Sequence, residues 1–250
     1  RALCEAVNSE SSPSGREILC QLIDNNRIAK AEEIPSCQDT GMAVVFLEVG
    51  QDVHIINGRV AEAVNEGVRR AYADGYFRKS VLTPLERVNT GDNTPAVIHT
   101  EIVPGDTLKI IAMPKGFGSE NMSAVRMLKP SDGRQGIVDF ILESVKAAGG
   151  SPCPPVVLGV GIGGTFDYAA FLAKKQLLRE VGSKNPDPAL AQMEDELKDK
   201  INALGIGPMG LGGNNYCLAV HIAQFPTHLA GLPVAVNFNC HALRHAEVTL

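Results

Sequence analysis

The chain of 250 residues (26.6 kDa) is 44% hydrophobic and 20% charged, which is the composition of a folded protein with a sizeable core and not of a disordered segment. Its 23 basic and 28 acidic residues give a formal charge of −5 without a polybasic stripe, so a nucleic-acid-binding surface is not expected. No apolar run approaches the roughly 20 residues that a membrane span needs, and no signal-peptide hydrophobic region opens the chain. We therefore expect a cytoplasmic protein that binds neither nucleic acid nor membrane.

Helical periodicity and short β-branched runs alternate irregularly along the chain. In chain order they predict a helix over 18–23, a strand over 42–49, a helix over 60–72, strands over 96–103 and 107–113, a helix over 137–145, a strand over 156–160, helices over 167–181 and 190–204, and strands over 216–222 and 233–238. Because strands are sometimes adjacent and sometimes separated by helices, this order favours an α+β fold with mixed sheets flanked by helices. We expect residues 1–250 to form a single domain.

The six cysteines are widely spaced and include no Cys-x-x-Cys pair. A secreted disulfide scaffold would be shorter and denser in cysteine, and a zinc finger needs closely spaced ligand pairs, so reduced thiols are expected. Three of them lie in loops at the ends of predicted strands: Cys37, Cys153 and Cys240. The other three lie in helical patterns or within an apolar strand: Cys4, Cys20 and Cys217.

Cys153 has the most unusual surroundings, because it stands between Pro152 and the pair Pro154-Pro155. Prolines remove backbone donors and fix the chain, and proline beside cysteine is a feature of iron–sulfur loops. Three loop thiolates could converge on one cubane cluster and leave one iron open to bind substrate as a Lewis acid. For each cysteine taken singly, burial as a small hydrophobic residue is the alternative.

Two glycine turns follow predicted strands. Gly159–Gly164 fits G-x-G-x-x-G, the turn of a dinucleotide-binding fold, but we expect another helix after it instead of a parallel strand carrying a ribose-binding acid. The segment could instead be a tight strand-to-helix turn or an anion site. If it does bind a dinucleotide, the alternative function is that of a nucleotide-binding oxidoreductase. The second turn, Lys115–Asn121, contains Gly116 and Gly118 and could bring backbone N–H groups close to a ligand.

Two polar side chains could act on a small acid. Arg87, in a polar loop, could capture a carboxylate with two hydrogen bonds, although a lone loop arginine can equally be a surface charge. Asp39 follows Cys37 by two positions, so it lies near an open iron if Cys37 binds a cluster, where it could transfer protons. An Asx turn is its alternative role. A third function, a non-catalytic binder of a small acid, also remains open.

The segments Cys-Gln-Asp-Thr-Gly from Cys37 and Asn-Thr-Gly-Asp-Asn-Thr-Pro from Asn89, together with the glycine turns and the cysteine-containing ends, closely resemble class I fumarate hydratases. More narrowly, they resemble the α-subunit type shared with L(+)-tartrate dehydratase, from about Ser12 to the last residue. The resemblance implies a [4Fe–4S] hydro-lyase that adds or removes water on a C4 dicarboxylate, fumarate or malate in the first place and tartrate as the other substrate. By motif it implies cluster ligands at Cys37, Cys153 and Cys240, a proton-transfer role for Asp39, and substrate contacts at Gln38, Asp39, Arg87, Gly116 and Gly118.

The resemblance also implies a partner. Single-chain members of this family continue into a second domain, whereas this sequence stops at Leu250. We therefore expect a separate β subunit, or a missing C-terminal domain, to supply the base that removes the carbon-bound proton. A homodimer of αβ units is expected, and the isolated chain is expected to be inactive.

Overall fold

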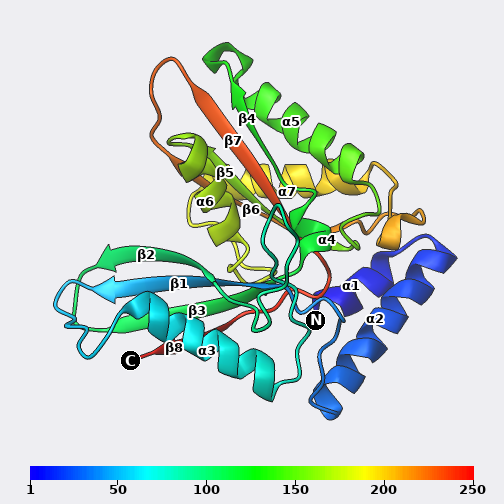
Figure 1. Cartoon of the computed structure of the whole chain (residues 1–250). Coiled ribbons are helices and arrows are strands. Elements are labelled where there is room, and N and C mark those ends of the chain that lie inside the picture. Colours follow the sequence, from blue (N-terminus) through cyan, green and yellow to red (C-terminus); the bar gives the residue numbers. More distant parts are fainter. The chain divides into compact units, whose positions relative to one another are not determined.

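The computed structural model describes residues 1–250 as two compact units (Figure 1). The first unit comprises Arg1–Ile28 and Gly118–Leu243, and the second comprises Ala29–Phe117 and Arg244–Leu250. Each unit has its own mixed sheet of four strands, so the predicted α+β fold with mixed sheets is confirmed. No helix is both long and apolar enough to cross a membrane.

The sheet of the first unit has the strand order β4-β7-β5-β6, in which β7 is antiparallel to both β4 and β5, and β5 is parallel to β6. Its strands are β4 (Ala124–Leu128), β5 (Val156–Gly163), β6 (Cys217–Phe225) and β7 (Leu232–Asn239). Its helices are α1 (Ala2–Ser9), α2 (Pro13–Ala31), α4 (Phe117–Glu120), α5 (Gly133–Ala148), α6 (Phe166–Gln176) and α7 (Pro188–Asn202), with short 3-10 turns at Pro130–Asp132 and Pro208–Gly210; α2 and α4 each begin in one unit and end in the other.

Helices cover both faces of this sheet. The large side chains of β5, such as Leu158, pack with α5 and α7 in the main core. The small residues Gly159 and Gly161 face α6, and a methyl group on Gly161 would lie 2.1 Å from the carbonyl oxygen of Ala169. The glycines of the G-x-G-x-x-G segment therefore permit close helix packing, which is the structural interpretation of that motif.

The second helix expected after the glycine turn is present, because α7 follows α6 directly. The chain then returns as β6, which is parallel to β5, and the sequence does not show that both helices belong to one crossover. The sequence of β6, Cys-Leu-Ala-Val-His-Ile-Ala-Gln-Phe, still contains no Asp or Glu for a ribose hydroxyl, so nothing favours a dinucleotide site here.

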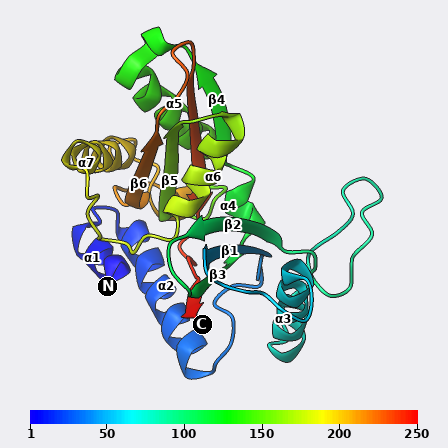
Figure 2. The same ribbon diagram turned by 90° about the vertical axis from the view of Figure 1, so that its left-hand side faces the viewer.

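The sheet of the second unit has the strand order β2-β1-β3-β8, in which β1 is parallel to β2 and antiparallel to β3. Its elements are β1 (Met42–Gly50), α3 (Val60–Asp74), β2 (Val97–Val103), β3 (Leu108–Lys115) and β8 (Ala246–Thr249). Buried side chains of β1, such as Val45 and Leu47, pack against Val60 and Val64 of α3. The segment between α3 and β2 forms a long loop that extends beyond the sheet (Figure 2).

Candidate active site

Cys153 and Cys240 meet at one end of the sheet in the first unit. Strands β5 and β7 are antiparallel with Val157 opposite Asn239, so the loop before β5 lies beside the residue that follows β7. The backbone N–H of His241 donates to the carbonyl oxygen of Cys153 at 3.5 Å. Two of the three candidate ligands are therefore brought together by strand register.

Cys153 is exposed and adopts a left-handed backbone conformation, with φ of 54°. Such a conformation is rare outside glycine and persists only where the surrounding structure holds it. Here the N–H of Cys153 donates to Gly150 at 3.1 Å, and the carbonyl of Pro154 accepts from the N–H of Met209 at 2.9 Å. The exposed thiol therefore stands on a fixed backbone.

The cysteines outside the candidate set differ in their surroundings. Cys217 is buried in β6, where burial raises the pKa of its thiol to about 12 and the thiol donates to the carbonyl oxygen of Ala219 at 3.2 Å. It is a packing residue, as its apolar strand indicates. Cys4 and Cys20 are exposed on helices α1 and α2. Cys37 and Cys240, in contrast, are half-buried and lie in loops.

The segment after the second glycine turn is fastened to the end of β7. The side chain of Asn237 donates to Glu120 at 2.9 Å and to the hydroxyl of Ser123 at 2.7 Å, and Lys174 also donates to Glu120. A methyl group on Gly118 would lie 3.8 Å from the carbonyl oxygen of Ser151, which belongs to the Cys153 loop. Gly118, the Cys153 loop and Cys240 therefore lie at the same end of this sheet.

In the second unit, Asp39 joins the Cys37 loop to the residues that follow β3. One carboxylate oxygen accepts from the N–H of Gly41 at 2.9 Å, which is the Asx turn suggested by the local sequence, and the other accepts from the N–H of Phe117 at 2.9 Å. The N–H of Asp39 donates to the sulfur of Cys37 at 3.4 Å. The carboxylate is therefore held in one orientation beside the candidate ligand.

Glycines occupy the positions where these segments touch. Gly41 has a φ of 75°, and a methyl group there would lie 2.6 Å from the backbone of Lys115. A methyl group on Gly116 would lie 3.1 Å from the carboxylate of Asp39. Two cations lie close by, because Arg244 donates to the Asp39 carbonyl and the buried Lys115 donates to the Gly116 carbonyl at 3.2 Å. This corner of the second unit suits an anionic ligand.

Gln38 and Arg87 are both exposed, but they occupy different places in the second unit. The amide oxygen of Gln38 lies 3.6 Å from the sulfur of Cys37. Arg87 has a φ of 57° in the long loop, which is closed by a bridge between Leu82 and Asn89. The structure therefore brings Gln38, Asp39 and Gly116 together around Cys37 and places Arg87 on a separate, structured loop.

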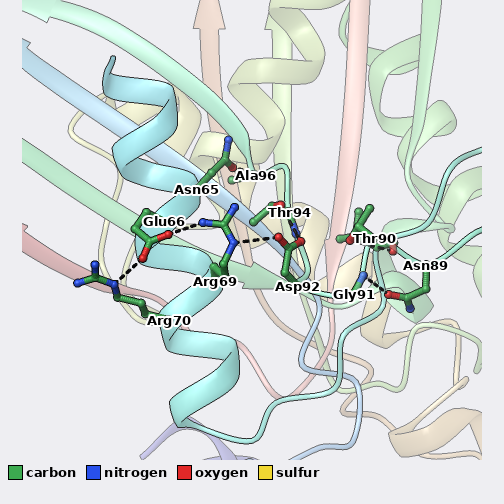
Figure 3. Close-up of polar contacts among 11 residues, drawn as sticks. Asn65, Glu66, Arg69, Arg70, Asn89, Thr90, Gly91, Asp92, Thr94 and Ala96 are labelled. Atoms are coloured by element: carbon green, nitrogen blue, oxygen red, sulfur yellow. Dashed lines mark hydrogen bonds and ion pairs between the residues drawn. The ribbon is translucent and has the colours of Figure 1, made fainter. Parts of the chain in front are cut away.

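The C-terminal end of that loop, just before β2, is anchored to helix α3 (Figure 3). The guanidinium of Arg69 donates to Asp92 at 3.0 Å, and the side-chain oxygen of Asn65 accepts from the N–H of Ala96 at 2.8 Å. Hydrogen bonds from the hydroxyl and N–H of Thr94, together with Arg69, lower the pKa of Asp92 to about 2. The loop that carries Arg87 is therefore fixed at its base.

Several residues that fasten the Asp39 turn were not singled out from the sequence. The hydroxyl of Tyr72 donates to the carbonyl of Thr40 at 2.6 Å, and burial raises the pKa of Tyr72 to about 12, so it is a neutral donor. Asn93 and Arg244 are the others. The only available signal was the polar Asn89–Pro95 string, which contains Asn93.

Neither unit alone gathers three His, Cys, Asp or Glu side chains into a metal-binding group. The candidate ligands divide between the units, with Cys153 and Cys240 in the first and Cys37 in the second.

Comparison with known proteins agrees with the family resemblance noted from the sequence. The family described as Fumarate hydratase (Fumerase) matches residues 1–249. The chain is 46% identical over 251 residues to a Methanocaldococcus jannaschii protein provisionally named L(+)-tartrate dehydratase subunit alpha, an alignment that covers 98% of this chain and 88% of that protein. It is 34% identical over 257 residues to the L(+)-tartrate dehydratase subunit alpha of Escherichia coli K12, covering 99% and 84% respectively.

Proposed function

Because the chain belongs to the fumarate hydratase (fumerase) family, we propose that it is the α subunit of a [4Fe–4S]-dependent hydro-lyase acting on a C4 dicarboxylate. The observation that carries this proposal is the meeting of Cys153 and Cys240 at one sheet end, in a chain that the family matches over residues 1–249. Fumarate and malate are the substrates proposed from the sequence, and the names of the relatives support tartrate.

The donor set fits an iron–sulfur cluster. Cys37, Cys153 and Cys240 are exposed or half-buried thiols in loops, and none is sealed in the core as Cys217 is. Thiolates are the usual ligands of such clusters. We propose these three as the ligands, and therefore propose that residues 1–250 function as a single catalytic domain. When bound, a cluster with three protein ligands supplies an iron that acts as a Lewis acid toward the substrate.

The chain's own residues would bind and orient the substrate. Asp39 presents a carboxylate that two backbone N–H groups hold still, which suits proton transfer at the substrate hydroxyl. Gly116 and Gly118 leave the backbone bare, so a substrate carboxylate can approach its N–H groups. Arg87 can take a second carboxylate with two parallel hydrogen bonds, and Gln38 offers an amide beside Cys37.

A partner completes this proposal. The relatives are named as α subunits, and we propose that a β subunit, or an equivalent C-terminal domain, supplies the base for the carbon-bound proton. The assembly would be a homodimer of αβ units in the cytoplasm.

Anaerobic reconstitution of the chain tests the cofactor. The wild-type chain should take up about four iron and four sulfide ions and show the brown absorbance of a cubane cluster. Cys153→Ser should abolish this absorbance, whereas Cys20→Ser, which removes an exposed thiol from helix α2, should preserve it. A wild-type chain that binds no iron, or full iron uptake by Cys153→Ser, would overturn the proposed cofactor.

A mixing experiment tests the reaction. The cluster-loaded chain should be inactive alone, and adding its β subunit should give water addition to fumarate or water loss from malate or tartrate. Turnover by the chain alone would contradict the need for a partner. Absence of turnover by a cluster-loaded αβ complex on all three acids would contradict the hydro-lyase function.

A further inference from the structure

Asn93 stands at the end of the loop that carries Arg87, and it is completely buried. Its backbone is in the left-handed region with φ of 63°, which asparagine tolerates better than most residues. A buried side-chain amide must satisfy its donors and acceptors within the protein. The partners of Asn93 therefore show which segments it holds.

The side-chain oxygen of Asn93 closes the loop on itself. It accepts hydrogen bonds from the N–H of Ser80 at 2.7 Å and from the N–H of Val81 at 3.2 Å. Ser80 and Val81 lie on the incoming side of the loop, and Asn93 lies on its outgoing side. The Asn93 side chain therefore joins the two sides of the loop at its base. This contact closes the base of the Arg87 loop.

The side-chain nitrogen of Asn93 points to a different segment. It donates to the carbonyl oxygen of Gly41 at 3.2 Å, and the N–H of Gly41 in turn donates to the carboxylate of Asp39 at 2.9 Å. Gly41 thus stands between the Asn93 amide and the Asp39 carboxylate. The hydroxyl of Thr40 gives a parallel link, because it donates to the carbonyl of Arg78 at 3.0 Å.

We infer that Asn93 is a positioning residue, which holds the Asp39 turn and the base of the Arg87 loop in a fixed mutual orientation. This inference rests on the proposed function, in which Asp39 transfers protons and Arg87 binds a substrate carboxylate. The described contacts of the Asn93 side chain are with Gly41, with the Tyr72 hydroxyl and with the loop base, so it acts on Asp39 and Arg87 through these groups. A displacement of about 1 Å in such a site can reduce turnover about 100-fold.

Asn93→Asp separates the loop-base contacts of this side chain from its contact with the Gly41 carbonyl. A carboxylate can still accept from Ser80 and Val81, but it has no N–H for the Gly41 carbonyl. Asn65→Asp is the matched control, because Asn65 also accepts a backbone N–H, that of Ala96, at the same loop base without contacting Gly41. Asn93→Ala, which buries no charge, replaces Asn93→Asp if that variant does not fold.

Two measurements decide the inference. In the cluster-free full chain, hydrogen exchange at the amides of Gly41 and Phe117, the donors to Asp39, should be about 3- to 10-fold faster in Asn93→Asp and unchanged in Asn65→Asp. In the αβ complex, kcat/KM should fall about 10- to 100-fold in Asn93→Asp while Asn65→Asp stays within about twofold.

The outcomes separate this inference from the proposed function. Unchanged exchange at Gly41 and Phe117 in the Asn93 variant would overturn the inference whatever the activity. Equal losses of kcat/KM in the Asn93 and Asn65 variants would also overturn it, because the loss would then reflect general loosening of the loop. A wild-type complex without hydro-lyase activity would overturn the proposed function, while the exchange measurement would still decide on the link.

Discussion

Among single residues, Asp39 shows most clearly how local geometry prepares a side chain for chemistry. One carboxylate oxygen accepts the backbone N–H of Gly41, and the other accepts the backbone N–H of Phe117. The glycine at 116 keeps the space beside the carboxylate free of a side chain. Orientation and access are thus supplied by backbone groups.

Asp39→Asn tests this role. The amide nitrogen would replace one oxygen, so one of the two N–H groups, of Gly41 or of Phe117, would lose its acceptor, and an amide does not exchange a proton as a carboxylate does. We expect kcat of the αβ complex to fall about 10²- to 10⁴-fold with unchanged iron content. Asp52→Asn, a change at an exposed carboxylate of the same unit, should leave kcat within about twofold. Comparable rates for the two variants would remove Asp39 from the proposed mechanism.

The dependence of the free energy of unfolding on pH below about 4 should report on Asp92. Its pKa lies at about 2, below the ordinary value of 3.8, so its contribution is fully present above about pH 4 and is lost as the pH falls toward 2. Urea unfolding at pH 4, 3 and 2 should therefore show a smaller loss of unfolding free energy in Asp92→Asn than in the wild type. Parallel losses in the two proteins would show that this anchor does not titrate as described.

Sequence reasoning could propose candidate chemical residues but not most of the residues that hold them in place. Cys37, Asp39 and Cys153 stand in distinctive short strings, so their types and neighbours were informative. Tyr72 and Arg244 reach the same turn from 32 and 205 residues away in the chain, and no local pattern encodes such contacts. Sequence spacing likewise could not show that Asn93 links the Arg87 loop to Gly41.

Among the helices and strands, packing of α6 on β5 explains the glycine-rich motif without a nucleotide. Gly159 and Gly161 let the backbone of α6 approach the strand, and the carbonyl oxygens of Ala169 and Ala173 occupy the space that side chains would need. The motif is therefore local evidence for close packing, and only the surrounding topology could test a cofactor role.

Two alanine substitutions should have opposite effects on stability. Gly161→Ala places a methyl group against the Ala169 carbonyl and should lower the free energy of unfolding by about 1–3 kcal/mol. Gly67→Ala, in helix α3 with no atom within 4 Å of the new methyl group, should raise it by about 0.5–1 kcal/mol. Urea denaturation of both variants checks the signs, and a neutral Gly161→Ala would contradict the packing described.

The longer elements were predictable and the short ones were not. Helices α2, α3, α5 and α7 contain several turns, so their apolar periodicity is visible in the sequence. Helix α4 has four residues, and β8 has four exposed residues that are placed only by pairing with β3. The predicted helix over 167–181 ends at Gln176, because residues 177–179 form turns.

For the whole molecule, the main finding is that the three candidate cysteine ligands are divided between the two units. The first unit supplies two candidate ligands through the register of β5 and β7, and the second supplies Cys37 beside Asp39. The central claim of the proposed function is that all three thiols bind one cluster.

Mössbauer spectroscopy of the chain reconstituted anaerobically with ⁵⁷Fe tests this claim most directly. The wild-type chain should show about four irons in a roughly 3:1 ratio, the minor component being the iron without a protein thiolate. Cys37→Ser should lose this spectrum as completely as Cys240→Ser does. A full cubane spectrum retained by Cys37→Ser would show that Cys37 is not a ligand of the cluster and would contradict the proposed set of three thiolates.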